Sequence, residues 1–526
     1  MIDAHWLTGS EMVLPFIQRR TLCPMTARAS GQTPRRLGEL VPGLGLQMNL
    51  PSDPVITGIT ADSRETRPGD LFVAIRGFAT DGHRFVGEAV VKGAVAVVLE
   101  DETYAPVGAP SLPVIVVPNS RKAAGQLAAE FYGHPSHKLC LVGVAGTNGK
   151  TTVSLLMDSI FRSCGHKTGV VGTLGRSVAG EWRGGERTTP DAIELQRLLA
   201  EMNHCGVTHV SMEVSSHALD LDRVVRCRFA GGIFTNLTQD HLDYHVSLDE
   251  YLQAKLRLFT TCADESDPGN PMVAAINADD PAGQQVAQAA RARVIMYGTN
   301  GGSEVRARSI SLGPNGSLFE LVIGRKAVPV ELKMPGQFNV HNALAAATCA
   351  YGLGVDIGDI IAGLESLEAV PGRFERVSGA RDYSVIVDYA HTPMALDNIL
   401  RAARNIGPKR IICVMGCGGD RDRGKRPKMG KVSADLADIT IVTSDNPRSE
   451  DPLAIIEDIK GGLAGGTYEV VPDRREAIFR AVELAEPGDM VVIAGKGHET
   501  YQEFADHRID FDDRIVAREA IEARDA

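Results

Sequence analysis

The chain has 526 residues, of which 44% are apolar, 23% charged and 5% aromatic, and its formal net charge is −11. This length predicts about three domains, and the composition is that of a folded globular protein, which excludes collagen, coiled coil and global disorder. The acidic balance excludes the broad basic surface of a general nucleic-acid binder, and no run reaches the roughly 18 uninterrupted apolar residues of a membrane-spanning helix.

Residues 1–36 differ from the rest of the chain. They contain five arginines and one short apolar run that Pro15 interrupts, which is not the pattern of a secretory signal. We therefore expect a disordered extension, with Met25 as an alternative translation start. The nine cysteines are odd in number and irregularly spaced, which predicts reduced thiols in a cytoplasmic protein and neither a disulfide framework nor a zinc site.

Strand and helix signals divide the remaining residues into three α/β blocks. In residues 37–137 the predicted strands lie at 71–77, 94–100 and 114–118. In residues 138–369 the segment 140–152 begins as a strand and runs into a glycine turn. Further strands are predicted at 208–215, at 231–237 and, as several short strands, at 272–335, before a long helix at 334–354. In residues 370–526 they lie at 384–390, 410–416, 439–445, 468–472 and 490–497. Strands alternating with helices predict mainly parallel sheets, and the last block is Rossmann-like but lacks G-x-G-x-x-G after its first strand, so dinucleotide binding does not follow.

A glycine turn joins the first strand of the second block to a helix, and consists of Gly146, Thr147, Asn148, Gly149, Lys150, Thr151 and Thr152. Glycines let backbone N–H groups turn toward phosphate oxygens at a helix N-terminus, while Lys150 can reach the terminal phosphates and the Thr151 hydroxyl can bind Mg²⁺. Val144 stands where the strict Walker pattern requires glycine. The order of strand, loop and helix still favours nucleotide binding over a plain glycine-rich turn.

Further motifs follow in order: TTPDA (188–192), MEVSSHAL (212–219), TNLTQDHLDYH (235–245), GRFE (372–375), VDYAHTP (387–393), TSDNPRSEDP (443–452) and AGKGHE (494–499). Together they closely resemble the Mur ligases, the ATP-dependent amide-forming ligases of peptidoglycan synthesis. The resemblance implies an α/β protein of three domains: a UDP-substrate-binding domain (37–137), a central P-loop ATP-binding domain with a mainly parallel sheet (138–369) and a Rossmann-like amino-acid-binding domain (370–526). It also implies a cytoplasmic monomer whose partners are small molecules, not nucleic acid or membrane.

The implied reaction phosphorylates a substrate carboxylate with ATP, after which an amine attacks the acyl phosphate. Because a carboxylate must approach a triphosphate, Mg²⁺ and lysines are expected. The resemblance assigns catalysis to Lys150, Glu213, His241 and Lys255, and metal binding to Thr151, Glu213, His241 and Lys255, the last as a carbamate (N6-carboxylysine). Without the resemblance, the sequence would indicate that Glu213 is a strand-end carboxylate facing solvent and that His241 is a structural histidine. Lys255 would then be a solvated lysine on an amphipathic helix.

The resemblance also assigns the two nucleotide substrates. ATP contacts are expected from the phosphate loop and from Asn339, Asn342, Arg373 and Asp388, although an asparagine near a helix start is often only a cap. Contacts to the UDP-N-acetylmuramoyl dipeptide are expected from Ser63, Phe78, Ala79, Thr80, Thr188, Thr189, Ser215 and Arg223. Leu221 departs from relatives that have a glutamine there, so that contact is expected to be absent or replaced.

The added amino acid is expected to be meso-2,6-diaminopimelate, bound by Arg421, Asp445, Asn446, Pro447, Arg448, Gly495 and Glu499. A guanidinium pairs bidentately with a carboxylate, so Arg448 suits the distal carboxylate that lysine lacks and would repel lysine's ammonium. The alternative for Arg421 is one charge in a solvated basic loop at 420–431.

Two other classes of function remain. Other ligases of the superfamily include folylpolyglutamate synthetase and the enzyme that adds D-Ala-D-Ala. The DNPR segment (445–448) together with the GKGHE segment (495–499) argues against both. A non-catalytic nucleotide-binding switch would keep the phosphate loop but would not need Glu213, His241, Lys255 and DNPR together. Phosphate release that requires both the dipeptide and the amino acid distinguishes a ligase from a switch or simple ATPase.

Overall fold

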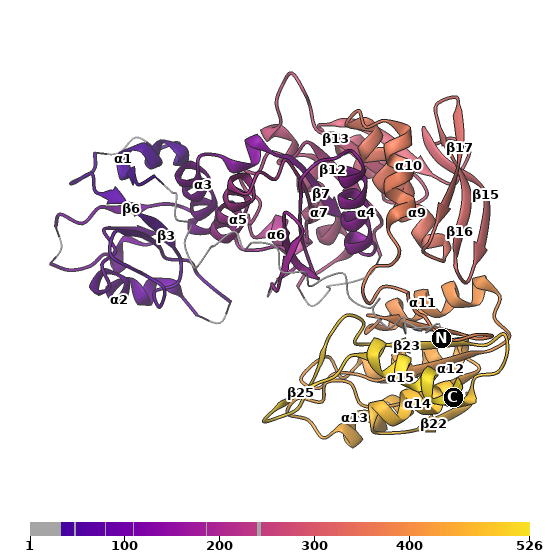
Figure 1. Cartoon of the computed structure of the whole chain (residues 1–526). Helices are drawn as coiled ribbons and strands as arrows, with labels where there is room; N and C mark the ends of the chain where they lie inside the picture. Colours follow the sequence, from indigo (N-terminus) through magenta and orange to yellow (C-terminus); the bar gives the residue numbers. More distant parts are fainter. Residues whose placement is uncertain are drawn as a thin grey trace, which may run out of the picture.

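The computed structural model describes residues 33–46, 49–78, 80–108, 110–185, 187–238 and 244–525. These residues form three α/β lobes that follow one another along the chain, from the indigo N-terminal lobe to the yellow C-terminal one (Figure 1). The predicted fold class of three α/β domains is therefore confirmed, whereas the individual domain boundaries stay a prediction.

The N-terminal lobe is built on a parallel sheet in the order β3-β4-β5-β6. Alternate residues of a strand face opposite sides, so Leu71 and Val73 pack with α1 and α3 while Phe72 packs with α2. Arg35 and Arg36, which the sequence assigned to a disordered extension, pair with β2 instead. The elements are β1 (Arg35–Arg36), α1 (Leu37–Leu40), η1 (Val41–Leu44), β2 (Val55–Ile56), β3 (Gly58–Thr60), β4 (Asp70–Val73), η2 (Gly82–Phe85), α2 (Val86–Val91), β5 (Ala96–Leu99), η3 (Glu102–Tyr104), β6 (Val114–Val116) and α3 (Ser120–Tyr132).

The central lobe contains an eleven-stranded sheet in the order β10-β9-β8-β11-β7-β12-β13-β14-β15-β16-β17. Strands β8 to β14 of this order are parallel, and antiparallel hairpins extend both edges. The elements are η4 (Pro135–Lys138), β7 (Cys140–Ala145), α4 (Lys150–Ser163), β8 (Thr168–Gly172), β9 (Gly175–Val178), β10 (Glu181–Arg183), α5 (Ala192–His204), β11 (His209–Glu213), α6 (Ser216–Asp220), β12 (Gly231–Phe234), α7 (Leu248–Phe259), η5 (Ala263–Glu265), β13 (Val273–Asn277), α8 (Gly283–Ala289), β14 (Arg293–Gly298), β15 (Val305–Gly313), β16 (Gly316–Ile323), β17 (Lys326–Leu332), α9 (Gln337–Gly352) and α10 (Ile357–Ser366).

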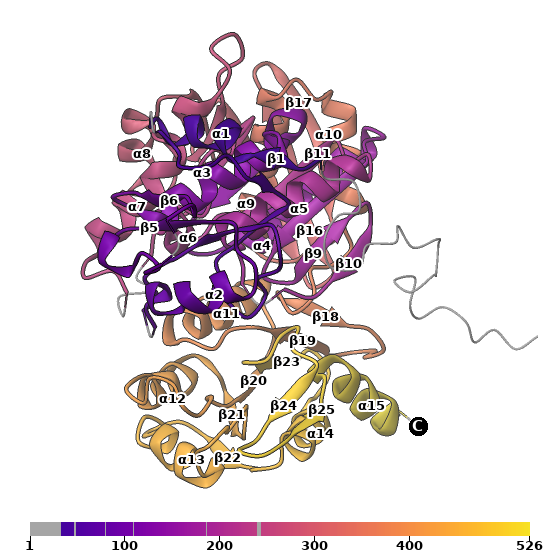
Figure 2. The same cartoon turned by 90° about the vertical axis from the view of Figure 1, so that its left-hand side faces the viewer.

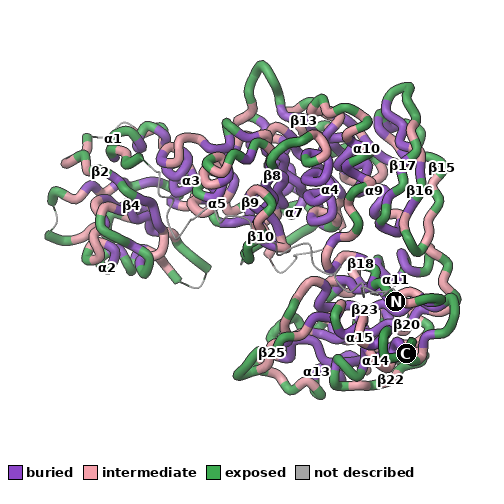
Figure 3. The backbone as a smooth tube through the Cα atoms, viewed as in Figure 1, coloured by how far each residue is buried: buried purple, intermediate pink, exposed green. Residues whose placement is uncertain are grey.

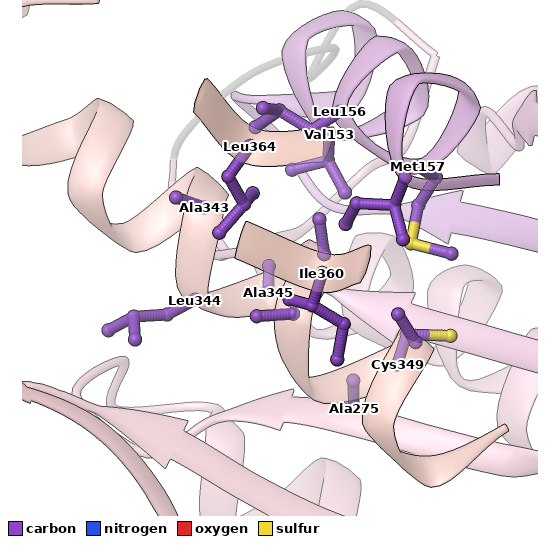
Figure 4. Close-up of a cluster of buried hydrophobic side chains, with 14 of the residues drawn as sticks. Val153, Leu156, Met157, Ala275, Ala343, Leu344, Ala345, Cys349, Ile360 and Leu364 are labelled. Carbon is purple, nitrogen blue, oxygen red and sulfur yellow. The ribbon is translucent and has the colours of Figure 1, made fainter. Parts of the chain in front are cut away.

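Two apolar clusters cover the two faces of this central sheet. Helices α4, α9 and α10 share one of them, in which Val153, Leu156 and Met157 of α4 lie close to Ile360 and Leu364 of α10 (Figure 4). The buried face of α9 contributes Ala343, Leu344, Ala345 and Cys349 to the same cluster. The helix after the phosphate loop is thereby fixed beside the helix that carries Asn339 and Asn342.

The C-terminal lobe has a six-stranded sheet in the order β18-β19-β23-β20-β21-β22, parallel except for β18. This is the predicted Rossmann-like alternation, with a separate hairpin of β24 and β25. The elements are β18 (Glu375–Val377), β19 (Ser384–Asp388), α11 (Pro393–Ile406), β20 (Ile411–Met415), α12 (Lys425–Leu436), β21 (Ile439–Val442), α13 (Pro452–Lys460), β22 (Tyr468–Val470), α14 (Arg474–Leu484), β23 (Met490–Ala494), β24 (Tyr501–Glu503), β25 (Arg508–Asp510) and α15 (Asp513–Asp525).

Each lobe has its own buried interior, seen as purple tube surrounded by pink and green (Figure 3). Helix α11 faces the central lobe in both orthogonal views (Figures 1 and 2). Within the described ranges, no helix combines the length and apolar character needed to cross a membrane.

Candidate functional site

The phosphate loop is fixed against the segment that follows β12. Thr147 and Asn148 donate their backbone N–H groups to the carbonyl and the side-chain oxygen of Asn236, each at 2.9 Å. Thr235 donates through Oγ1 to the carbonyl of Asn148 at 2.6 Å. The loop conformation is therefore set by tertiary hydrogen bonds as well as by its own sequence.

Two glycines of the loop have a backbone that other residues rarely adopt. Gly146 has φ 150° and Gly149 has φ 87°, and such positive angles cost a residue with a Cβ atom free energy. A Cβ at Gly146 would collide with Thr235 Oγ1, and one at Gly149 with Asn342 Oδ1. The same glycines thus permit both the turn and the close approach of α9.

Two lysines converge on the carbonyl groups of this loop. Lys150 Nζ donates to Gly146 O at 3.1 Å and to Thr147 O at 2.8 Å. Lys255, in α7, donates from Nζ to the same Gly146 O at 2.8 Å and lies 4.0 Å from the centre of the Tyr251 ring. Only 1% of Lys255 is exposed, which contradicts its interpretation as a solvated lysine.

Glu213 ends β11 directly beside the helix start. Its Oε1 accepts from Thr151 Oγ1 at 3.0 Å and from the backbone N–H of Thr173 at 2.8 Å. The residue is 2% exposed, so it is not a solvent-facing strand end. A Cβ at Gly172 would collide with this carboxylate, which shows how tightly the neighbouring strand surrounds it.

The donor set at the loop suits a hard divalent cation. Mg²⁺ prefers oxygen ligands and usually keeps several waters beside one or two carboxylates. Thr151 and Glu213 supply a hydroxyl and a carboxylate in contact with one another. In the part of the chain that the structure describes, no group of three or more His, Cys, Asp or Glu side chains could hold a metal, and His241 lies outside the described residues.

A cavity of about 510 Å³ opens between the phosphate loop, α9 and α11. It joins the central and C-terminal lobes and is large enough for a nucleotide. Its lining residues are Asn148, Gly149, Thr152, Thr235, Asn236, Thr238, Asn277, Asp279, Asp280, Pro281, Tyr297, Gln337, Phe338, His341, Asn342, Arg373, Asp388, Ala395, Asn398, Ile399, Arg401, Ala402 and Asn405.

Four predicted ATP residues lie in or behind this cavity. Asn342, Arg373 and Asp388 line it. Asn339 is 2% exposed and accepts from Asn342 Nδ2 at 3.2 Å while donating to Pro335 O at 2.9 Å. Asn339 therefore orients Asn342 from behind the cavity wall.

The sequence-based prediction missed polar residues on the cavity wall. Asp279 accepts from Thr299 Oγ1 at 2.8 Å and from Asn300 Nδ2 at 2.6 Å, and His341 Nε2 lies 3.1 Å from the oxygen that Thr299 contacts. The sequence could have indicated Asp279, because this residue follows a buried strand and ligands of parallel sheets bind at the carboxyl ends of the strands. His341 gave no such signal, since it sits within a long helical pattern.

Asp388 combines burial with a nearby cation. Burial raises the pKa of its carboxyl group to about 6, against the opposing effect of Arg373 and of the backbone N–H groups of Phe374 and Ala390. Phe374 N donates to Oδ2 at 2.7 Å. The carboxyl group thus lies at the junction of the second and third lobes, with its pKa raised by burial.

The predicted dipeptide-binding residues of the central lobe form one cluster at the end of β11. Thr189 donates through Oγ1 to Glu213 O at 2.9 Å and accepts from the Ser215 backbone N–H at 3.2 Å. Arg223 Nη1 donates to Thr189 O at 3.0 Å, and Thr188 Oγ1 lies 3.1 Å from the hydroxyl of Thr173. Leu221 directly follows α6 and has no polar side-chain group.

The predicted uridine residues lie at one edge of the N-terminal sheet. Ser63 follows β3 and Phe78 follows β4, and the carboxyl ends of parallel neighbours meet at the same edge. Ser63 is buried and donates to Glu88 Oε2 at 3.1 Å, whereas Phe78 is 79% exposed and its ring centre is 6.0 Å from that of Tyr244 in the central lobe. Thr80 is exposed, and Ala79 lies outside the described residues.

The DNPR and GKGHE segments meet on Asn446. Asn446 Nδ2 donates to Glu499 Oε2 at 2.8 Å. Lys496, which is completely buried and was missed from the sequence, donates from Nζ to Asn446 Oδ1 at 3.0 Å and to Glu499 Oε2 at 3.1 Å. Gly495 has φ 124°, and a Cβ there would press on Asp445 Oδ2.

Two predicted arginines lie close to Gly418. A Cβ at Gly418 would be 2.9 Å from Arg448 Nη1 and 4.0 Å from Arg421 Cγ. Arg448 donates from Nη1 to Gly419 O at 2.9 Å, and Gly419 packs so closely on Pro447 O that a side chain would not fit. Arg421 is exposed and donates to Asp420 O at 3.0 Å, so the solvated-loop alternative for this residue stays open.

Known protein families match all three lobes. Residues 55–132 match the family described as "Mur ligase family, catalytic domain", residues 144–350 "Mur ligase middle domain" and residues 372–497 "Mur ligase, glutamate ligase domain". A UDP-N-acetylmuramoyl-L-alanyl-D-glutamate--2,6-diaminopimelate ligase of Bacillus cereus is 45% identical over 90% of this chain and 95% of its own length. The ligase of the same name from Syntrophomonas wolfei is also 45% identical, over 93% and 99%.

Solved structures give a consistent result. A UDP-N-acetylmuramoyl-L-alanyl-D-glutamate--2,6-diaminopimelate ligase superposes with a TM-score of 0.69 at 33% identity, covering 94% of this chain and all of that one. A Mycobacterium tuberculosis folylpolyglutamate synthase has a TM-score of 0.58 at 19% identity over 72% of this chain and 92% of its own. At that identity the likeness shows a shared fold alone.

Proposed function

This chain belongs to the Mur ligase family, and from that premise we propose that it joins meso-2,6-diaminopimelate to UDP-N-acetylmuramoyl-L-alanyl-D-glutamate with ATP. The product is an amide at the carboxylate of the D-glutamyl residue, a step of peptidoglycan precursor synthesis. The proposal includes action as a cytoplasmic monomer. The eight described cysteines, all of them free thiols, are compatible with a reducing compartment.

The observation that carries the proposal is the pair of opposite charges around Asn446. Glu499 contacts Asn446 directly, and Arg448 lies two residues further along the same loop. Diaminopimelate ends in an amino group and a carboxylate on the same distal carbon. Glu499 suits the ammonium and Arg448 the carboxylate, since a guanidinium pairs bidentately with a planar anion.

The first chemical step is transfer of the ATP γ-phosphoryl group to the D-glutamyl carboxylate. A carboxylate oxygen forms a bond to phosphorus as the bond to the ADP oxygen breaks. Lys150 and Lys255 are hydrogen-bonded to neutral carbonyl oxygens of the loop. Because Lys150 has a flexible four-carbon stem and three N–H donors, it can turn toward the incoming phosphates and offset the charge that develops there.

Mg²⁺, when bound by Thr151 and Glu213, would neutralise phosphate charge and orient the terminal phosphate. Lys255 is buried against the same loop, and we include its conversion to a carbamate in the proposal. A neutral lysine amine adds to CO₂ and releases a proton, which replaces a buried cation with a carboxylate-like anion. That anion would add two oxygen ligands to those that Thr151 and Glu213 supply. His241 completes the proposed ligand set.

The second step is attack by the diaminopimelate amine on the acyl carbon. The new C–N bond forms, the amine loses a proton and inorganic phosphate leaves. Thr188, Thr189, Ser215 and Arg223 form a cluster next to Glu213, and we assign to them the diphosphate and the muramoyl dipeptide. Asn342, Arg373 and Asp388, with Asn339 behind them, are assigned to ATP, and Ser63 with the loop at 78–80 to uridine.

An amino-acid panel tests the proposal. Purified protein is incubated with ATP, Mg²⁺, UDP-N-acetylmuramoyl-L-alanyl-D-glutamate and one amino acid at a time, and the product is identified by its mass. We expect an adduct with meso-diaminopimelate, little with L-lysine, and phosphate release only when both substrates are present. Equal use of D-Ala-D-Ala or glutamate, or phosphate release without an acceptor, would contradict the assignment.

A further inference from the structure

The guanidinium of Arg448 is held on two sides by the protein. Its Nε donates to Glu503 Oε2 at 3.0 Å and its Nη1 to Gly419 O at 2.9 Å. Its backbone N–H donates to Glu503 O at 3.0 Å, and the residue has φ 51°, an angle that is uncommon for residues other than glycine. One residue, Glu503, therefore fixes both the backbone and the side chain of Arg448.

These contacts select the part of the guanidinium that a ligand can use. A guanidinium has five N–H donors, which form forks with a carboxylate. The pair Nε and Nη2 forms one fork, and Glu503 already occupies Nε. The fork left for a second carboxylate is the one made by Nη1 and Nη2, since Gly419 O takes only one of the hydrogens on Nη1.

Glu503 is itself held by a second arginine and by the DNPR loop. Arg508, across the β24–β25 hairpin, donates from Nε to Glu503 Oε1 at 3.0 Å, and this pairing lowers the pKa of Glu503. The backbone N–H of Glu503 donates to Asn446 Oδ1 at 3.0 Å. The two carboxylate oxygens of Glu503 thus accept hydrogen bonds from two different arginines. Its backbone is hydrogen-bonded to Asn446, the residue that also contacts Glu499.

We propose that Glu503 is a positioning residue for amino-acid specificity, which orients the free fork of Arg448 toward the distal carboxylate of the substrate. The inference rests on the proposed function and adds to it a residue outside the DNPR and GKGHE segments. Without the Glu503 carboxylate, Arg448 can rotate about its long side chain. Substrate binding would then have to order the Arg448 side chain, and the conformational entropy lost in doing so would weaken binding.

The test is a comparison of kcat and KM for meso-diaminopimelate and L-lysine in the wild type, Glu503→Ala and Glu503→Gln. Glutamine keeps an oxygen that can accept from Nε but loses the charge. Glu469→Gln is the matched control, because Glu469 pairs with Arg480 at 2.9 Å on the edge strand β22 of the same lobe.

We expect Glu503→Ala to raise the KM for diaminopimelate by roughly 10- to 100-fold with a change in kcat of less than about threefold, and to reduce its preference over lysine accordingly. Glu503→Gln should fall between alanine and wild type, and the control should match wild type. If Glu503→Ala does not fold, the glutamine variant decides alone. An unchanged KM in every folded variant would overturn the inference, and so would a lowered KM, which would make Glu503 a competitor for Arg448. If the wild type itself does not use diaminopimelate, the proposed function fails, and the inference with it.

Discussion

The phosphate loop and the DNPR loop both present cations to an anionic ligand, but they hold those cations differently. At the phosphate loop, Lys150 and Lys255 donate to backbone carbonyls of Gly146 and Thr147. At the DNPR loop, Arg448 donates to the carboxylate of Glu503 as well as to a carbonyl. Backbone carbonyls thus help to place the two lysines, whereas a carboxylate side chain helps to orient the arginine.

This difference suits the two tasks that we propose. Lys150 is a compact point charge on a flexible stem, which suits a triphosphate that arrives and later leaves as ADP. An arginine paired with a carboxylate is directionally fixed, so it can discriminate between ligands that differ by one carboxylate. The comparison predicts that charge-removing changes have their largest effect on rate at the first site and on selectivity at the second.

The largest effect is expected from Lys150→Ala and Glu213→Ala. Each removes a charge from the proposed ATP–Mg²⁺ site, where a single stabilising group is typically worth about 10²–10³-fold in rate, so we expect kcat to fall by at least that much. The measurement is product formation by purified variants whose thermal unfolding matches wild type. Lys167→Ala, an exposed lysine after α4, is the control. Near-normal turnover in either site variant would break the comparison.

Lys255 sharpens the comparison, because it is the cation that we propose is converted to an anion. Lys255→Ala should lose about 10²-fold or more in kcat, and short carboxylic acids should restore part of it by supplying the missing oxygens. Lys255→Arg should stay inactive, since it restores a positive charge where a negative one is needed. An active arginine variant would show that the site uses a cation there.

Arg448→Ala tests the selectivity half of the comparison. Removing one partner of a hydrogen-bonded charge pair costs about 2–5 kcal/mol, so kcat/KM for diaminopimelate should fall by roughly 30- to 4,000-fold. Lysine use should stay poor, because the rest of the pocket still fits the larger substrate, whereas the wild type should prefer diaminopimelate by about 10⁴-fold. Equal use of both amino acids by the wild type would contradict this prediction, and so would an unchanged kcat/KM for diaminopimelate in Arg448→Ala.

The smallest effect concerns pH and the carboxyl group of Asp388. Because its pKa in the folded protein is raised from 3.8 to about 6, its contribution to stability is fully present below pH 3.8 and is lost as pH rises through 6. Asp388→Asn cannot ionise, so its melting temperature relative to wild type should increase between about pH 4 and pH 6.5. Differential scanning calorimetry at several pH values measures this, with the exposed Asp382→Asn as control. A difference that stays constant across the range would contradict the titration of Asp388.

The local pattern of the sequence determined the elements and the chemistry of single segments. Buried strands at 384–390 and 410–416, for example, correspond to β19 and β20, because continuous apolar runs between turns favour strands covered on both faces. The phosphate loop was equally visible, since its glycines, lysine and threonines act through their immediate backbone. Residues 1–32 and His241 lie outside the described structure, so the predictions made for them stay predictions.

Only the tertiary structure decided how distant segments combine. Lys255 has the sequence of a surface residue, yet α7 packs it beneath the phosphate loop, more than a hundred residues away in the chain. His341 and Glu503 gave no signal of their own, and Lys496 was marked only by lying within the AGKGHE motif, because each acts through a partner that the fold brings to it. Periodicity along a chain encodes which face of an element is buried, but the identity of the group opposite that face is a property of packing.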